Sequence, residues 1–119
     1  MNKLNSFLSI VALAVISAAP VTTKAADEST TIKGEILDLA CYADHGAQGE
    51  KHVACAQKCI TSGLPVGIKA GDGKVYLVVG EHKPLNKELA PEAGKTVTLK
   101  GKLVSKDGVN LLENAEIVK

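Results

Sequence analysis

Cysteine and histidine residues are concentrated between positions 41 and 59 of the chain. Cys41 and His45 come first, and His52, Cys55 and Cys59 follow. If the second half of this stretch is helical, the side chains of His52, Cys55 and Cys59 fall within about 60° of one another on one face. Thiolate and imidazole are the donors that zinc and monovalent copper prefer. We therefore predict a zinc or copper site built from these five residues.

Two carboxylates flank Cys41 and are candidates for orienting the ligands. Asp38 precedes this cysteine by three positions, and Asp44 follows it beside His45. A metal-ligating imidazole usually donates its second ring N–H to a carboxylate, a carbonyl or water. We expect Asp44 to be such an acceptor, and Asp38 is a second candidate.

A disulfide is the alternative use of the same cysteines. Pairing Cys41 with Cys55 or with Cys59 closes a loop of about 15 to 20 residues, which contributes roughly 3 kcal/mol in the chain-entropy model. Cys55 and Cys59 are less suited to each other, because side chains four apart on a helix run nearly parallel. Either pairing leaves one thiol over, available for a covalent dimer or for thiol redox chemistry next to Lys58. Both uses remain open at this point.

Spacing also limits the cofactor and the activity. Cys-x-x-Cys-His does not occur, so covalently attached haem c is excluded. Gly71-Asp72-Gly73 is a hairpin turn rather than a phosphate loop, so we expect no nucleotide. No catalytic triad order or acid–base pair of carboxylates stands out, which favours binding over catalysis. Cys-x-x-x-Cys with a nearby His is similar to the copper ligand spacing of copper delivery chaperones and of the dinuclear copper subunit of cytochrome oxidase, a similarity that implies copper.

The N-terminus has the features of a secretory signal peptide. Lys3 is followed by an apolar stretch over 7–19, and Ala25 ends a small-residue exit. We predict cleavage after Ala25, a single domain over 26–119 that does not span a membrane, and a periplasmic or secreted location with a periplasmic protein as partner. Cleavage removes Lys3 and Lys24, so the mature chain keeps 12 of the 14 basic residues and all 13 acidic ones. Its formal net charge is 12 − 13 = −1, and the sequence contains no Arg. Nucleic acid is therefore not an expected partner.

Alternating apolar residues and glycine-rich turns predict a mainly β fold. We expect strands at 32–40, 65–69, 75–79, 96–104 and 109–118, with Leu99, Gly101 and Leu103 facing inward on the fourth. A helix is expected at 50–62 because Gly63 and Pro65 end it, and the connector 80–94 should carry one or two helical turns. Cys41 falls at the end of the first strand on this assignment. The elements indicate a small five-stranded OB-like antiparallel barrel with one inserted helix after the first strand.

The last hairpin carries a resemblance to a known group of proteins. Residues 98–104, Thr-Leu-Lys-Gly-Lys-Leu-Val, followed by Asp107-Gly108, resemble the final hairpin of bacterial exported OB-fold proteins. The resemblance implies a barrel whose face or rim loops meet a ligand or partner, and it assigns no catalytic residue.

Overall fold

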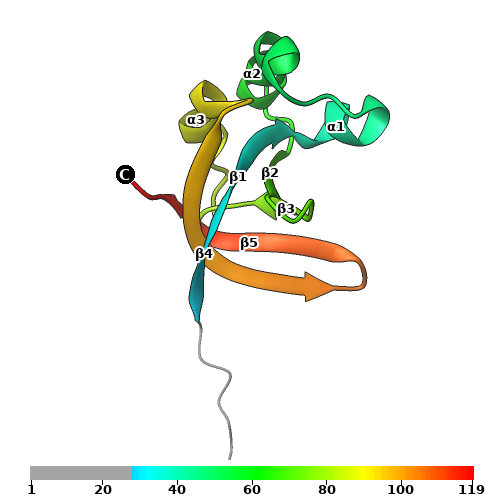
Figure 1. The fold of residues 1–119 in the computed structure, drawn as a ribbon. Helices are drawn as coiled ribbons and strands as arrows, with labels where there is room; N and C mark the ends of the chain where they lie inside the picture. The colour runs from blue at the N-terminus through cyan, green and yellow to red at the C-terminus, as the bar shows by residue number, and fades with distance from the viewer. Residues whose placement is uncertain (1–27) are drawn as a thin grey trace, which may run out of the picture.

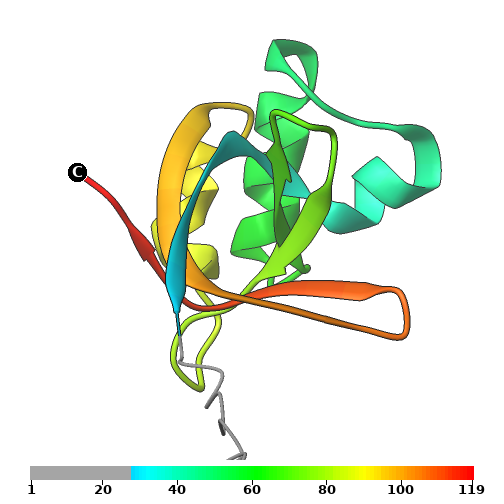
Figure 2. The same cartoon turned by 60° about the horizontal axis from the view of Figure 1, so that its bottom comes forward.

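Five strands close into a barrel in the computed structural model, which describes residues 28–119. The predicted signal peptide, 1–25, lies outside these residues. The strands are β1 (Ser29–Asp38), β2 (Val66–Ala70), β3 (Val75–Val78), β4 (Thr96–Lys106) and β5 (Val109–Ile117). They follow one another around the barrel in the order β1-β2-β3-β5-β4, and Figure 2 looks into this ring. The predicted small OB-like barrel is confirmed.

Strand direction corrects the prediction at one seam. Four of the five pairings are antiparallel, but β3 and β5 pair in parallel, with Leu77 opposite Leu111 and Val78 opposite Leu112. The reason is topological. A closed ring with an odd number of strands cannot alternate direction throughout, so one neighbouring pair must run the same way.

Side chains on the inner face of the barrel build the core. Ile36, Ile68, Leu99 and Leu112 have no exposed surface. Leu103, predicted to face inward, is instead 40% exposed, because the outer part of the β4–β5 hairpin extends beyond the barrel and leaves this face uncovered (Figure 1). The hairpin bends away at the register shift between Lys100 and Lys102. The intervening Gly101 lies so close to β5 that an added Cβ would come within 2.8 Å of the Glu113 carbonyl oxygen.

Two helices, rather than one, are inserted between β1 and β2. The predicted helix at 50–62 is present as a 3₁₀ turn, η1 (Glu50–His52), that leads into α2 (Val53–Thr61). An additional helix, α1 (Leu39–His45), begins where the first strand was expected to continue. Cys41 therefore lies in a helix and not at a strand end. The strand stops at Asp38 because the Asp38 side chain accepts a hydrogen bond from the Ala40 N–H at 3.1 Å and caps α1.

The helices gather at the end of the barrel where β1 finishes (Figure 1). The connector between β3 and β4 contains α3 (Asn86–Leu89) and the 3₁₀ turn η2 (Ala90–Glu92), which confirms the predicted helical turns. α2 packs against β1, α3 and η2, and its Ile60 is fully buried. The Asn86 amide donates to the carbonyls of Ile60 and Leu64 at 2.8 and 2.7 Å, which satisfies the end of α2. Within residues 28–119 no helix has the length and hydropathy needed to cross a membrane.

Candidate metal centre

Three thiols from two helices converge beside the barrel. Cys41 is on α1, and Cys55 and Cys59 lie one turn apart on α2. Their sulfur atoms all lie within 4.8 Å of one another, and all three cysteines are free. Zinc–sulfur bonds of about 2.3 Å place tetrahedral sulfur ligands roughly 3.8 Å apart, so a small contraction would let one ion bond to all three. We call Cys41, Cys55 and Cys59 the thiol cluster.

Contacts at the start of α1 bring Cys41 over α2. The Leu39 N–H donates to the Pro65 carbonyl at 3.0 Å, which ties the first residue of α1 to the segment that follows α2. The Leu39 side chain rests on Gly67 of β2, where an added Cβ would lie 2.3 Å from Leu39 Cδ2. At the other end of α1, Gly46 has a φ of 71° and its N–H donates to the Tyr42 carbonyl at 2.9 Å. The position of Cys41 thus depends on tertiary contacts that surround it.

Asp38 lies next to the thiol cluster and is buried, with 2% of its surface exposed. Its Oδ1 caps α1, whereas Oδ2 has no hydrogen-bond partner of ordinary geometry in the described part of the chain. The predicted role of Asp38 is to orient a metal-ligating imidazole. The carboxylate acts on the thiols of Cys41 and Cys59, and thiols are weak donors that satisfy a carboxylate oxygen poorly.

The neighbourhood of Asp38 keeps two of the thiols protonated. The pKa of Cys41 is raised to about 12, first by hydrogen bonding with the Asp38 carboxylate, then by burial and by repulsion between that carboxylate and the thiolate. The pKa of Cys59 is raised as well, first by burial and then by the same carboxylate. Cys41 and Cys59 are half-buried, and Cys55 is exposed. A metal ion must therefore displace protons when it binds to the cluster.

The two histidines of the predicted site lie close to each other and not among the sulfurs. The rings of His45 and His52 meet edge to face with centroids 6.2 Å apart. The three sulfurs lie within 4.8 Å of one another. Among residues 28–119, no imidazole nitrogen and no carboxylate oxygen lies within that distance of all three. His45 is exposed, and its Nδ1 lies 3.2 Å from Oδ2 of Asp44. Asp44 thus lies beside an imidazole outside the thiol cluster, and its role in orienting a metal ligand stays a prediction.

His52 precedes α2 and is not part of that helix. It ends η1 with φ −109° and ψ 2°, so the α-helical spacing to Cys55 and Cys59 does not extend through it. Its side chain lines a small cavity of about 10 Å³, together with Asp38 and Ala56. The ligand roles of His45 and His52 stay predictions.

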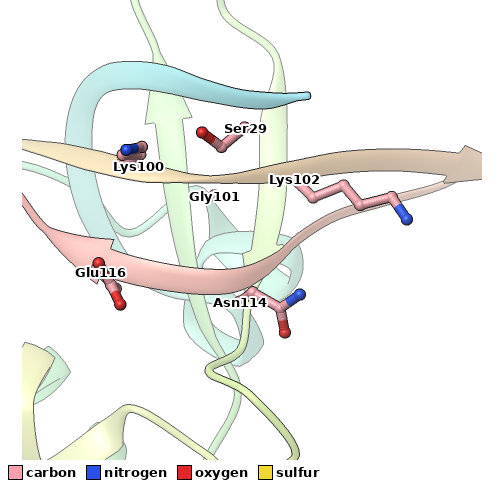
Figure 3. A pocket seen from close by; sticks show the side chains of 6 residues that line it. All are labelled: Ser29, Lys100, Gly101, Lys102, Asn114 and Glu116. Atoms are coloured by element: carbon pink, nitrogen blue, oxygen red, sulfur yellow. The ribbon is translucent and has the colours of Figure 1, made fainter. Parts of the chain in front are cut away.

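A larger hollow on the opposite part of the sheet lacks the features of a binding site. Its lining comes from β1, β4 and β5 and consists of Ser29, Lys100, Gly101, Lys102, Asn114 and Glu116. Figure 3 shows that these side chains do not converge on a common point. Ligand sites usually present a few polar groups aimed at one place. His82, on the exposed loop after β3, lines another hollow with Val79 and Glu113 and is not part of the thiol cluster.

The thiol cluster is therefore the best-formed chemical site in the described chain, and comparison with known proteins adds no further assignment. No model of a protein family, no curated protein and no solved structure matches this sequence or fold.

Proposed function

We propose that this protein is an exported binding protein that holds one zinc or copper ion in the thiol cluster. The observation that carries the proposal is the convergence of three sulfurs from two helices within 4.8 Å. Two of them belong to one helix, but Cys41 arrives on α1, whose start is fixed by separate contacts to Pro65 and Gly67. Three thiolates are a recognised ligand set for soft or borderline metal ions.

The exposure of the cluster favours delivery of the ion over permanent storage. Cys55 is exposed, so a donor atom from another protein can approach the ion through this side. Ligand exchange at an exposed thiolate lets an ion pass between proteins without first entering water. A periplasmic protein with its own thiol or imidazole ligands is the partner that this chemistry fits.

Native mass spectrometry of the reduced protein, combined with metal analysis, tests the proposal. We expect one ion per chain in the wild type and loss of stoichiometric binding in Cys41→Ser, Cys55→Ser and Cys59→Ser. Ala54→Ser is the matched control, because it introduces a hydroxyl at an exposed position of the same helix without removing a sulfur. Reduced protein that never takes up a stoichiometric ion would exclude the function.

Oxidation of the cluster is the competing proposal, because sulfurs this close can pair after a modest movement. The protein would then be a disulfide-stapled interaction module with one leftover thiol. Counting thiols under denaturing, non-reducing conditions separates the two: one thiol per chain indicates the disulfide, and three indicate the reduced site.

Export is tested independently of the metal. We expect the protein to fractionate with the periplasm or the medium, and N-terminal sequencing of the exported form to begin at Ala26. A chain that retains its first residues and stays in the cytoplasm would remove this part of the proposal.

A further inference from the structure

We propose that Asp38 supplies the fourth ligand of the thiol cluster through Oδ2, and that this oxygen favours a divalent ion, zinc, over monovalent copper. The inference rests on the proposed metal-binding function and deepens it. His45 and His52 are the predicted nitrogen ligands, and Asp38 is a buried carboxylate next to both helices of the thiol cluster.

One oxygen of the Asp38 carboxylate is buried without a partner in the described part of the chain. Asp38 is the only buried charged residue among residues 28–119, and no hydrogen bond of ordinary geometry or ion pair in that range reaches its Oδ2. Burying an ionised carboxylate oxygen without a partner is costly. The hydrogen bond that caps α1 uses only Oδ1, so helix capping gives a partner to one of the two carboxylate oxygens. A bound cation would supply the partner that Oδ2 lacks.

The Asp38 carboxylate lies next to both helices that carry the thiol cluster. Asp38 caps α1, the helix that carries Cys41, and together with Ala56 of α2 it lines a small cavity of about 10 Å³. The carboxylate thus lies beside both helices that carry the sulfurs, and together with burial it raises the pKa values of Cys41 and Cys59. Its oxygens lie outside the group of donors that are mutually within 4.8 Å, so the side chain must rotate toward the sulfurs when an ion binds. Three sulfurs and one oxygen then give the four donors of a tetrahedral zinc site.

The formal charge of the four donors favours a divalent ion. Three thiolates and the Asp38 carboxylate carry a formal charge of −4, which zinc reduces to −2 but monovalent copper only to −3. Excess charge in a partly buried site is unfavourable. Oxygen is also a harder donor than sulfur, and monovalent copper is satisfied by soft thiolates alone. The carboxylate therefore contributes more to zinc affinity than to copper affinity.

Asp38→Asn tests the inference because asparagine also caps helices well, so the start of α1 is retained. Zinc and monovalent copper affinities are measured by chelator competition on reduced protein. We expect Asp38→Asn to lower zinc affinity by about 10- to 100-fold and to change copper affinity by less than about threefold. Asp107→Asn removes an exposed carboxylate from the turn between β4 and β5, where asparagine tolerates the φ of 51°, and it should leave both affinities unchanged.

The outcomes separate this inference from the function on which it rests. Unchanged zinc affinity in Asp38→Asn, or equal losses for zinc and copper, would overturn the ligand assignment while metal binding stood. A wild type that binds neither ion would overturn the proposed function itself. Zinc-edge X-ray absorption of the wild type gives a second measurement if Asp38→Asn does not fold. Three sulfurs and one oxygen are expected, and an imidazole scattering pattern or a fourth sulfur would contradict the inference.

Discussion

The two carboxylate oxygens of Asp38 have different surroundings, and the difference controls the chemistry of its neighbours. Oδ1 accepts a hydrogen bond from a backbone N–H, but Oδ2 is buried with no hydrogen-bond partner in the described part of the chain. A carboxylate disfavours a thiolate beside it, so Cys41 stays protonated well above neutral pH although it is only half-buried. Exposure alone would therefore give a wrong estimate of the reactivity of this cysteine.

Alkylation of the ligand-free protein tests this effect without any metal. Because only the thiolate attacks iodoacetamide, and the pKa of Cys41 is raised to about 12, we expect slow labelling of Cys41 near about pH 8. Asp38→Asn removes the largest cause of that shift and should speed the labelling of Cys41 by at least about tenfold. Peptide mapping by mass spectrometry measures the rate. Asp44→Asn should label like the wild type, and an unchanged rate in Asp38→Asn would assign the raised pKa to another cause.

Proton release gives a second prediction for the same residues. The pKa values of Cys41 and Cys59 are both raised, so these thiols are protonated at neutral pH and a metal ion must displace their protons. Raising the pH lowers the cost of that displacement. Metal affinity should therefore increase by about tenfold per pH unit for each displaced proton. Calorimetry in buffers of different ionisation enthalpy counts the protons released. Affinity independent of pH would point to ligands that carry no proton, such as carboxylates alone.

At the scale of elements, α1 decides whether the site forms. It was not predicted, because Leu37 and Leu39 continue the alternation of the first strand. The change from strand to helix depends on the helix cap that Asp38 provides and on the hydrogen bond from the Leu39 N–H to the Pro65 carbonyl. Pro65 is distant from Leu39 in the sequence. Long-range contacts of this kind leave no local pattern. The site could thus be predicted on α2, where Cys55 and Cys59 are one turn apart, but not on α1.

Gly67→Ala tests whether the metal site depends on the close packing of Leu39, at the start of α1, against β2. An alanine Cβ would lie 2.3 Å from Leu39 Cδ2 and 2.7 Å from Cγ, so Leu39 must move and take α1 with it. We expect the free energy of unfolding to fall by about 1–3 kcal/mol and metal affinity to fall as well. Urea titration measures the first and chelator competition the second. Gly71→Ala is the matched control, because no atom lies within 4 Å of its added Cβ. Equal effects of the two substitutions would show that the close approach is not limiting.

At the scale of the whole molecule, much of the barrel follows from local pattern. Alternating apolar residues indicate the five strands, and glycine turns such as the one at Gly108 indicate the hairpins. Two features depend on closure of the ring instead. The parallel pairing of β3 with β5 follows from the odd number of strands, and the exposure of Leu103 follows from the length of the last hairpin beyond the barrel. Neither is visible in the sequence of a single strand.

The core and the thiol cluster are separate parts of the molecule. The buried cluster of hydrophobic residues includes Ile60 of α2 and contains no cysteine. α1 contributes no buried residue at all. The barrel should therefore fold without metal, whereas α1 depends on its end contacts and on any ion that links Cys41 to α2.

Hydrogen exchange with and without metal tests that division. A chelator should leave the amides of β1, β4 and β5 protected, because their bonds belong to the closed barrel. Amides over 39–52 should exchange faster, because removing the ion removes the link between α1 and α2. Cys41→Ser with metal present should match the chelated wild type over α1. Loss of protection throughout the chain would instead make the ion a folding requirement, and unchanged exchange over α1 would show that no ion joins the two helices. The expected result fits a protein that can release its ion to a partner and remain folded. Only the segment that contains α1 and Cys41 would lose protection, and the barrel would keep it.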